Sequence, residues 1–195
     1  MNKLLWLLPV TLLLYACPFE STVALEKKPV EPVDSSLFGY WYGIVKDGSD
    51  FFGIEALDIT GHSDSVYVIT RYGKAIKGDI ILPDTAYFTG YTSWIGGNQY
   101  MNIVADIIID EPRKNSKIRE MRKQRVYYIA RLDRSNDTLT VKTVTENFSP
   151  KKYFVSPEDI KQAIVKQTSD KVDIFDDQYS LSYKRITKPQ PFKSF

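Results

Sequence analysis

From Leu37 onward, apolar and polar residues alternate along the chain with a period of two, and β-branched and aromatic residues are frequent. This pattern is typical of half-buried β-strands. Turn-forming stretches such as "KDGSD", "PDT", "IGGN" and "DRSND" separate the alternating runs. Short strands at this regular spacing favour an antiparallel barrel or sandwich. The pattern predicts strands at residues 38–46, 51–60, 64–72, 75–82, 85–94, 98–109, 125–133, 137–146 and 178–187.

The period changes at residues 156–168, "SPEDIKQAIVKQT". Ser156 stands at a favourable N-cap position, Pro157 at the first helical position, and two acidic residues follow in the first turn. A narrow apolar stripe at helical spacing is formed by Ile160, Ala163, Ile164 and Gln167. The chain therefore predicts one helix placed shortly before the last strand.

The first residues carry a different pattern. Lys3 precedes a mostly apolar run from Leu4 to Ala16, which is shorter than the roughly 20 residues of a membrane-spanning helix. The run therefore indicates a signal peptide over residues 1–16. It ends "LYAC", which resembles the bacterial lipobox. That resemblance implies cleavage before Cys17 and lipidation of Cys17 with acyl chains such as palmitate. A secretory signal with an incidental cysteine is the alternative.

Cys17 is the only cysteine of the chain. Once it is lipidated, no thiol remains for a disulfide or a cysteine zinc site. The residue after it is Pro18 rather than Asp, which by analogy with enterobacterial sorting favours the outer membrane of a bacterial envelope. Residues 17–36 lack a sustained period and predict a flexible, solvated tether. We therefore expect a domain over residues 37–188 and a C-terminal tail over residues 189–195.

Net charge is only +2, but basic residues are concentrated in one segment. Residues 113–125, "RKNSKIREMRKQR", contain a single acid, Glu120. A solvated loop or short helix between two strands explains the segment, and an anion-facing patch is the functional alternative. The envelope location and the lack of interleaved aromatic residues argue against nucleic acid. The candidate anion-binding residues are Arg113, Lys114, Lys117, Arg119, Arg122, Lys123 and Arg125.

The first predicted strand contains Gly39-Tyr40-Trp41, a G-x-W motif, and the last contains Arg185. This pairing resembles the lipocalins and their relatives, and the chain looks most like small bacterial lipoproteins of that type. The resemblance implies an up-and-down β-barrel of about eight to nine strands. It also implies that Trp41 and a basic residue, Arg185 or Lys184, seal the barrel floor. The disulfides and the T-D-Y-x-x-Y motif of typical lipocalins are absent.

Residues with catalytic or metal-binding potential are sparse. His62 is the only histidine and stands in the predicted turn "TGHSD", where a solvated role is the simpler explanation. Asp106, Asp110 and Glu111 fit the end of a strand better than a carboxylate pair or metal site. No phosphate-binding glycine motif is present. We therefore expect a protein that is not an enzyme and that uses no cofactor or metal.

Aromatic residues at alternating positions suggest a cavity. Tyr87, Tyr91 and Tyr128 are the candidate cavity residues, together with Trp41 at the floor. The same residues would also fill a solid core. We expect a membrane-tethered envelope lipoprotein that binds or carries a small amphipathic ligand in its barrel. The alternative is a solid interaction module that binds an envelope protein or an anionic polymer or lipid through its outer face and residues 113–125.

Overall fold

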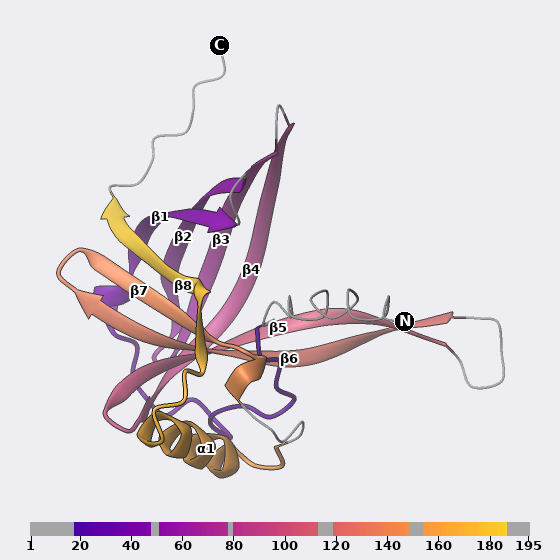
Figure 1. Ribbon diagram of the computed structural model, residues 1–195, viewed down its shortest axis with the longest axis vertical. Helices are drawn as coiled ribbons and strands as arrows, with labels where there is room; N and C mark the ends of the chain where they lie inside the picture. Colours follow the sequence, from indigo (N-terminus) through magenta and orange to yellow (C-terminus); the bar gives the residue numbers. More distant parts are fainter. Residues whose placement is uncertain (1–17, 48–50, 78–79, 113–118, 149–153, 187–195) are drawn as a thin grey trace, which may run out of the picture.

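The structure is a computed structural model that describes residues 18–47, 51–77, 80–112, 119–148 and 154–186. These residues form strands, one α-helix and two 3-10 helices (Figure 1). The helical elements are η1 (Ser35–Leu37), η2 (Glu146–Phe148) and α1 (Pro157–Ser169). The strands are β1 (Gly39–Asp47), β2 (Phe51–Ser63), β3 (Val66–Lys77), β4 (Ile80–Ile95), β5 (Asn98–Pro112), β6 (Arg119–Ser135), β7 (Thr138–Val144) and β8 (Phe175–Ile186).

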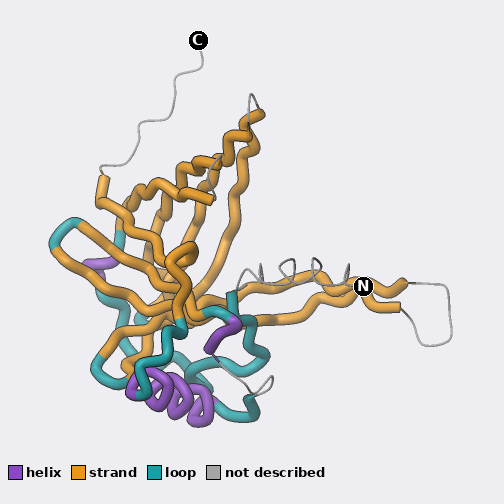
Figure 2. The backbone as a smooth tube through the Cα atoms, viewed as in Figure 1, coloured by secondary structure: helices purple, strands orange, loops and turns teal. Residues whose placement is uncertain are grey.

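Each strand pairs antiparallel with the next one along the chain, and β8 pairs with β1 to close a barrel of eight strands. Figure 2 shows how strand dominates the described chain. The predicted fold class, all-β with one C-terminal helix and an antiparallel up-and-down barrel, is confirmed. The architecture is consistent with the lipocalin-like fold that the G-x-W motif implies.

Two predicted turns are wrong. The stretch "TGHSD" at residues 60–64 is predicted to be a turn, but its residues up to Ser63, including His62, lie in β2. The stretch "PDT" lies within β4, where Pro83 pairs with Lys74 of β3. Proline lacks a backbone N–H and is tolerated in a strand only where no neighbour needs that donor. In the part of the chain that the structure describes, β4 pairs with β5 only from Thr89 onward, so the other edge of β4 is open at Pro83. The predicted strands 75–82 and 85–94 therefore correspond to the end of β3 and to β4.

The barrel is closed around one end and split at the other. β4 pairs with β5 between Thr89 and Ile95, whereas the earlier part of β4 follows β3 alone. β5 and β6 remain paired with each other beyond this point and form a long two-stranded arm (Figure 1). The wall of the barrel consequently separates between β4 and β5.

Buried apolar side chains form two clusters, one inside the barrel and one on its outer face. The inner cluster comprises Leu37, Trp41, Leu57, Ile59, Tyr67, Ile69, Met101, Leu132, Leu139 and Tyr183. The outer cluster comprises Phe19, Leu25, Ile95, Tyr100, Ile129, Val144, Phe148, Ile160, Ile164 and Ile174. Because successive side chains of a strand point to opposite faces, one set of strands supplies both clusters.

The helix α1 supplies part of the outer cluster. Ile160 and Ile164 are buried there and Ala163 packs beside them, which confirms the predicted stripe. Ser156 is the N-cap and its hydroxyl accepts a hydrogen bond from the Asp159 amide at 3.2 Å, also as predicted. Among the described residues, no helix has both the length and the apolar character needed to cross a membrane.

Residues 18–34, here called the strap, run along the outside of the barrel. The Phe19 amide donates to the Val144 carbonyl at 2.9 Å. Ser21 exchanges two backbone hydrogen bonds with Tyr127 of β6, at 2.8 and 3.0 Å. The strap thereby extends the sheet where β7 ends.

Two apolar residues of the strap, Phe19 and Leu25, are buried. Leu25 has no exposed surface, and its amide donates to the buried Asn102 side chain at 2.8 Å. Phe19 packs edge-on against Phe148 with ring centres 5.1 Å apart. The prediction of a solvated tether is therefore wrong for the described residues 18–36. Cys17 itself and the tail 189–195 lie outside the described residues.

Candidate ligand cavity

A partly open cavity of about 590 Å³ lies inside the barrel and extends to the split between β4 and β5. This volume lies within the range of small-molecule sites in proteins, about 300–1,000 Å³. Most of its lining is apolar, and side chains of inward-facing strand positions dominate it. The apolar lining includes Leu37, Leu57, Ile59, Ile69, Phe88, Met101, Ile103, Leu132, Leu139, Val141 and Leu181.

Trp41 and Arg185 lie in contact at the closed end of the barrel, beyond the residues that line the cavity. Trp41 has no exposed surface, and the guanidinium carbon of Arg185 lies 4.5 Å from the centre of its ring. The Trp41 indole N–H donates to the Leu37 carbonyl at 2.8 Å. Arg185 also donates to the carbonyls of Ser36 and Phe38. Arg185, rather than the neighbouring Lys184, is therefore the residue stacked on the tryptophan.

The segment around η1 closes the same end. The Val33 amide donates to the Asp64 carbonyl in the β2–β3 turn at 2.8 Å, and the Asp34 amide donates to the Tyr67 hydroxyl. The Asp34 carboxylate caps η1 by accepting from the Ser36 amide at 2.8 Å. Hydrogen bonding with Ser36 lowers the pKa of Asp34 below its ordinary value. The segment thus joins the β2–β3 turn to β8 across the barrel end.

A polar network interrupts the apolar wall above the floor. The Tyr183 hydroxyl of β8 donates to the Glu55 carboxylate of β2. The other oxygen of Glu55 lies 4.0 Å from Nε of Arg71 on β3. Burial, followed by the nearby Glu55 charge, strongly raises the pKa of Tyr183, so its hydroxyl stays protonated. All three residues line the cavity.

Gly43 makes this network possible. β1 lies between β8 and β2, so the Tyr183 ring must cross β1 to reach Glu55. A Cβ at Gly43 would lie 2.9 Å from the Tyr183 ring, which is closer than carbon atoms pack. The glycine leaves a flat stretch of backbone on which the ring lies.

The cavity reaches the surface near the split between β4 and β5. Tyr87 lies at this rim and is 75% exposed. Tyr128 lines the cavity from β6, and its hydroxyl donates to the Glu20 carboxylate of the strap at 2.7 Å. Burial together with that hydrogen bond raises the pKa of Tyr128 to about 12. Pro18, the first described residue, also lines the cavity.

Tyr91 does not line this cavity, so its predicted role is wrong. It lies on the outer face of β4 beneath the strap, where its hydroxyl donates to the Glu26 carbonyl at 3.2 Å. Burial raises the pKa of Tyr91 to about 12. Tyr91 lines a separate, open groove of about 570 Å³ together with strap residues.

The predicted anion patch is described only in part. Arg113, Lys114 and Lys117 lie outside the described residues, and the side chain of Arg119 is not described. The expected loop or short helix is wrong for residues 119–125, because they belong to β6 and pair with β5.

Lys123 and Arg125 of this strand share one carboxylate. Their side-chain nitrogens lie 3.0 and 3.2 Å from the oxygens of Asp106 on β5. These hydrogen bonds lower the pKa of Asp106. Asp106 lines the rim of the cavity, so the arm places two cations beside the opening.

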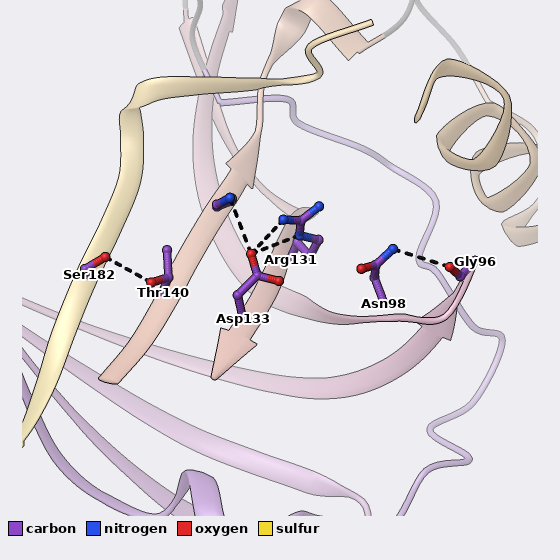
Figure 3. A network of polar contacts seen from close by, with 7 residues as sticks. Gly96, Asn98, Arg131, Asp133, Thr140 and Ser182 are labelled. Atoms are coloured by element: carbon purple, nitrogen blue, oxygen red, sulfur yellow. Dashed lines mark hydrogen bonds and ion pairs between the residues drawn. The ribbon is translucent and has the colours of Figure 1, made fainter. Parts of the chain in front are cut away.

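A second charged group lies on the outer face, away from the cavity. Asp133 accepts from Arg131 at 2.7 Å and lies 3.4 Å from the Lys142 ammonium. The guanidinium carbon of Arg131 also lies 5.2 Å from the centre of the Phe175 ring. Figure 3 shows this group beside the hydrogen bond between Thr140 and Ser182. It links side chains of β6, β7 and β8 on the outer face, and no residue of it lines the cavity.

Sequence reasoning missed the polar network. Glu55 shares one face of "FFGIEALDIT" with Leu57 and Ile59, so a charged residue stands on an otherwise apolar face. That break in the alternation was the available indication. Its partners lie on two other strands, and their proximity follows only from the strand register.

Comparisons of the chain with protein-family models, with curated proteins and with solved structures found no match. The following proposals therefore depend on the cavity and on the chemistry of its lining.

Proposed function

We propose that this protein binds or carries a small amphipathic ligand inside its barrel. The observation that supports this proposal is the cavity of about 590 Å³ with an apolar lining and one internal polar network. A solid interaction module would fill this space with side chains. Apolar walls with a few placed polar groups are typical of small-molecule sites.

The proposed role is binding rather than catalysis. The Tyr183 hydroxyl donates to Glu55, and its raised pKa opposes the phenolate form that a tyrosine nucleophile or base would need. Glu55 in turn lies between Tyr183 and Arg71. This arrangement suits a fixed, preorganised binding surface.

Native mass spectrometry of the protein purified gently from its own host tests the proposal. We expect an added mass of roughly a few hundred daltons that disappears on denaturation, as suits a drug-sized ligand. The strap must be retained, because Phe19 and Leu25 belong to the packed fold.

Two neighbouring substitutions sharpen this test. Ala105 lines the cavity, whereas Val104 lines the outer groove on the opposite face of β5. Ala105→Trp should abolish the added mass, and Val104→Trp should retain it while both proteins remain folded. Equal retention of the added mass by both variants would contradict ligand binding in the barrel. The proposal would also be contradicted if the parent protein carried no added mass and took up no neutral apolar dye.

We also propose that the barrel is anchored to a bacterial envelope membrane through lipidated Cys17. The lipobox-like "LYAC" supports this proposal. Two or more acyl chains hold a protein stably, whereas one holds it only marginally. Cys17→Ser should move the protein from the membrane fraction to the soluble fraction. Persistence of the variant in the membrane fraction would refute the lipid anchor.

A second candidate function is favoured by the exposed side chains of the β5–β6 arm. Ile108 and Met121 are 70% and 78% exposed, and Lys123 and Arg125 lie beside them. Apolar tips among cations suit an anionic membrane surface. Met121→Ser should weaken sedimentation of the protein with anionic vesicles and leave the cavity occupancy unchanged. Unchanged sedimentation would count against this role.

A further inference from the structure

The polar network divides the cavity into a polar level and an apolar level. Along β3, the next inward position toward the closed end after Arg71 is Ile69, which pairs with Ile59 of β2, whereas Leu57 pairs with Arg71 itself. Trp41 belongs to the same buried cluster as these residues. A bound molecule that fills the cavity therefore meets apolar walls at its inner part and the network further out.

Within the network, Arg71 is the group most accessible from the cavity. Its side chain is 37% exposed, against 15% for Glu55, while the whole Tyr183 residue is 2% exposed. The Tyr183 ring and hydroxyl cover one oxygen of the Glu55 carboxylate. A ligand head at this level therefore encounters the guanidinium before the carboxylate.

The chemistry of arginine sets the kind of head group. A guanidinium presents five N–H donors in a planar fork that matches carboxylate and phosphate oxygens, so it can donate to a ligand in addition to its contacts within the protein. The Glu55 carboxylate lies beside the fork, 4.0 Å from Nε. Glu55 is itself held by Tyr183 across Gly43.

Charges of both signs lie near the rim. Lys123 and Arg125 pair with Asp106, and the Glu20 carboxylate accepts a hydrogen bond from Tyr128 of the lining. These two cations and two carboxylates balance, so the choice of head group depends on Arg71.

We propose that Arg71, positioned by Glu55 and Tyr183, makes the cavity selective for single-chain amphiphiles with an anionic head group. This inference rests on the proposed function, since it specifies the ligand class of the same cavity. The apolar tail lies against Ile59 and Ile69, and the head accepts hydrogen bonds from Arg71.

The test compares three amphiphiles with one tail and different heads. Dodecanoate, dodecanol and dodecyltrimethylammonium each compete with Nile red, a neutral dye, for the purified protein. Because a charge-assisted hydrogen bond is stronger than a neutral one, we expect dodecanoate to bind about tenfold or more tightly than dodecanol. The trimethylammonium compound should bind most weakly.

Substitutions of Arg71 test whether this residue causes the selectivity. Arg71→Met should remove the preference for dodecanoate while dodecanol affinity changes by less than about threefold, since the apolar level is untouched. Arg71→Lys should restore part of the preference, because it keeps the charge without the fork. Arg134→Met is the matched control, since Arg134 is exposed and lies outside the cavity lining.

The outcomes separate the two proposals. Equal affinities for all three amphiphiles, tightest binding of the cation, or a preference that survives in Arg71→Met would overturn the anionic-head inference and leave ligand binding intact. Failure of Nile red and of every amphiphile to bind would overturn the proposed function as well. If Arg71→Met does not fold, the order of the affinities of the three amphiphiles for the parent protein still tests the anionic-head inference.

Discussion

Arg185 of the last strand lies directly opposite Trp41 of the first strand, and its guanidinium carbon lies 4.5 Å from the centre of the indole ring. The described residues of β1 and β8 share only three register pairs, of which this is one. The contact therefore has two effects in the same place. It covers one end of the buried cluster inside the barrel, and it joins the two strands whose pairing closes the barrel.

Replacing Trp41 by alanine should lower the free energy of unfolding by about 3–5 kcal/mol, because a fully buried indole leaves a large void. Chemical denaturation of the purified protein measures this loss. Trp94→Ala is the matched control, since Trp94 is 56% exposed, and it should change stability by about 0.5 kcal/mol or less. Equal losses in the two variants would show that Trp41 does not form a buried floor.

Replacing Gly43 by alanine should lower the free energy of unfolding by about 1–3 kcal/mol, because the new methyl group collides with the Tyr183 ring. A double-mutant cycle with Tyr183→Leu isolates the collision. In the Tyr183→Leu background the cost of Gly43→Ala should shrink, since the ring is gone. An unchanged cost would assign the effect to the neighbouring Ser182 carbonyl instead.

Replacing Leu25 by alanine should cost about 2–5 kcal/mol, because its side chain is completely buried in the outer cluster. Val30→Ala on the same strap is the control, since Val30 is 65% exposed and should change stability little. The denaturation midpoints of the two variants measure the difference. Parallel behaviour of Leu25→Ala and Val30→Ala would mean that the strap does not pack in solution.

Alkaline pH should destabilise the fold through Tyr91. Its pKa is about 12 in the folded protein against an ordinary value of 10.0, so the folded state keeps a proton that the unfolded chain releases. The stabilisation is complete below pH 10 and is lost as the pH rises toward 12. Tyr91→Phe should therefore show a shallower fall in unfolding free energy over this interval. Parallel curves of unfolding free energy against pH for the two proteins would contradict the raised pKa of Tyr91.

The alternation of residues predicted the barrel because its strands have one face toward the interior, and period-two patterns report that face. The helix was equally predictable from the sequence, since Ser156 and Pro157 mark its start and Ile160 and Ile164 mark its buried face. Pro83 was read as a turn residue. A proline is tolerated in β4 at this position because β4 pairs with β5 only from Thr89 onward in the described chain, and no local sequence pattern encodes that pairing.

The predictions for Tyr91 and for the strap were wrong for the same reason. Strap residues cover the outer face of β4, so both faces of the strand at Tyr91 are buried and the pattern does not distinguish inside from outside. Leu25 finds its partner Asn102 at a separation of 77 residues, so its burial depends on the completed barrel. The network of Glu55, Arg71 and Tyr183 likewise requires the register of separate strands.

The strap also has a consequence for how the chain reaches its final form. Glu20 bonds to Tyr128 across 108 residues, and Leu25 bonds to Asn102 across 77. These contacts close loops that contain most of the barrel, and distant closures form late and slowly. The first described residues to be synthesised are therefore among the last to settle. We therefore expect the strap to stay unattached until β5 and β6 are in place, so that its attachment to β6 is a late step of folding.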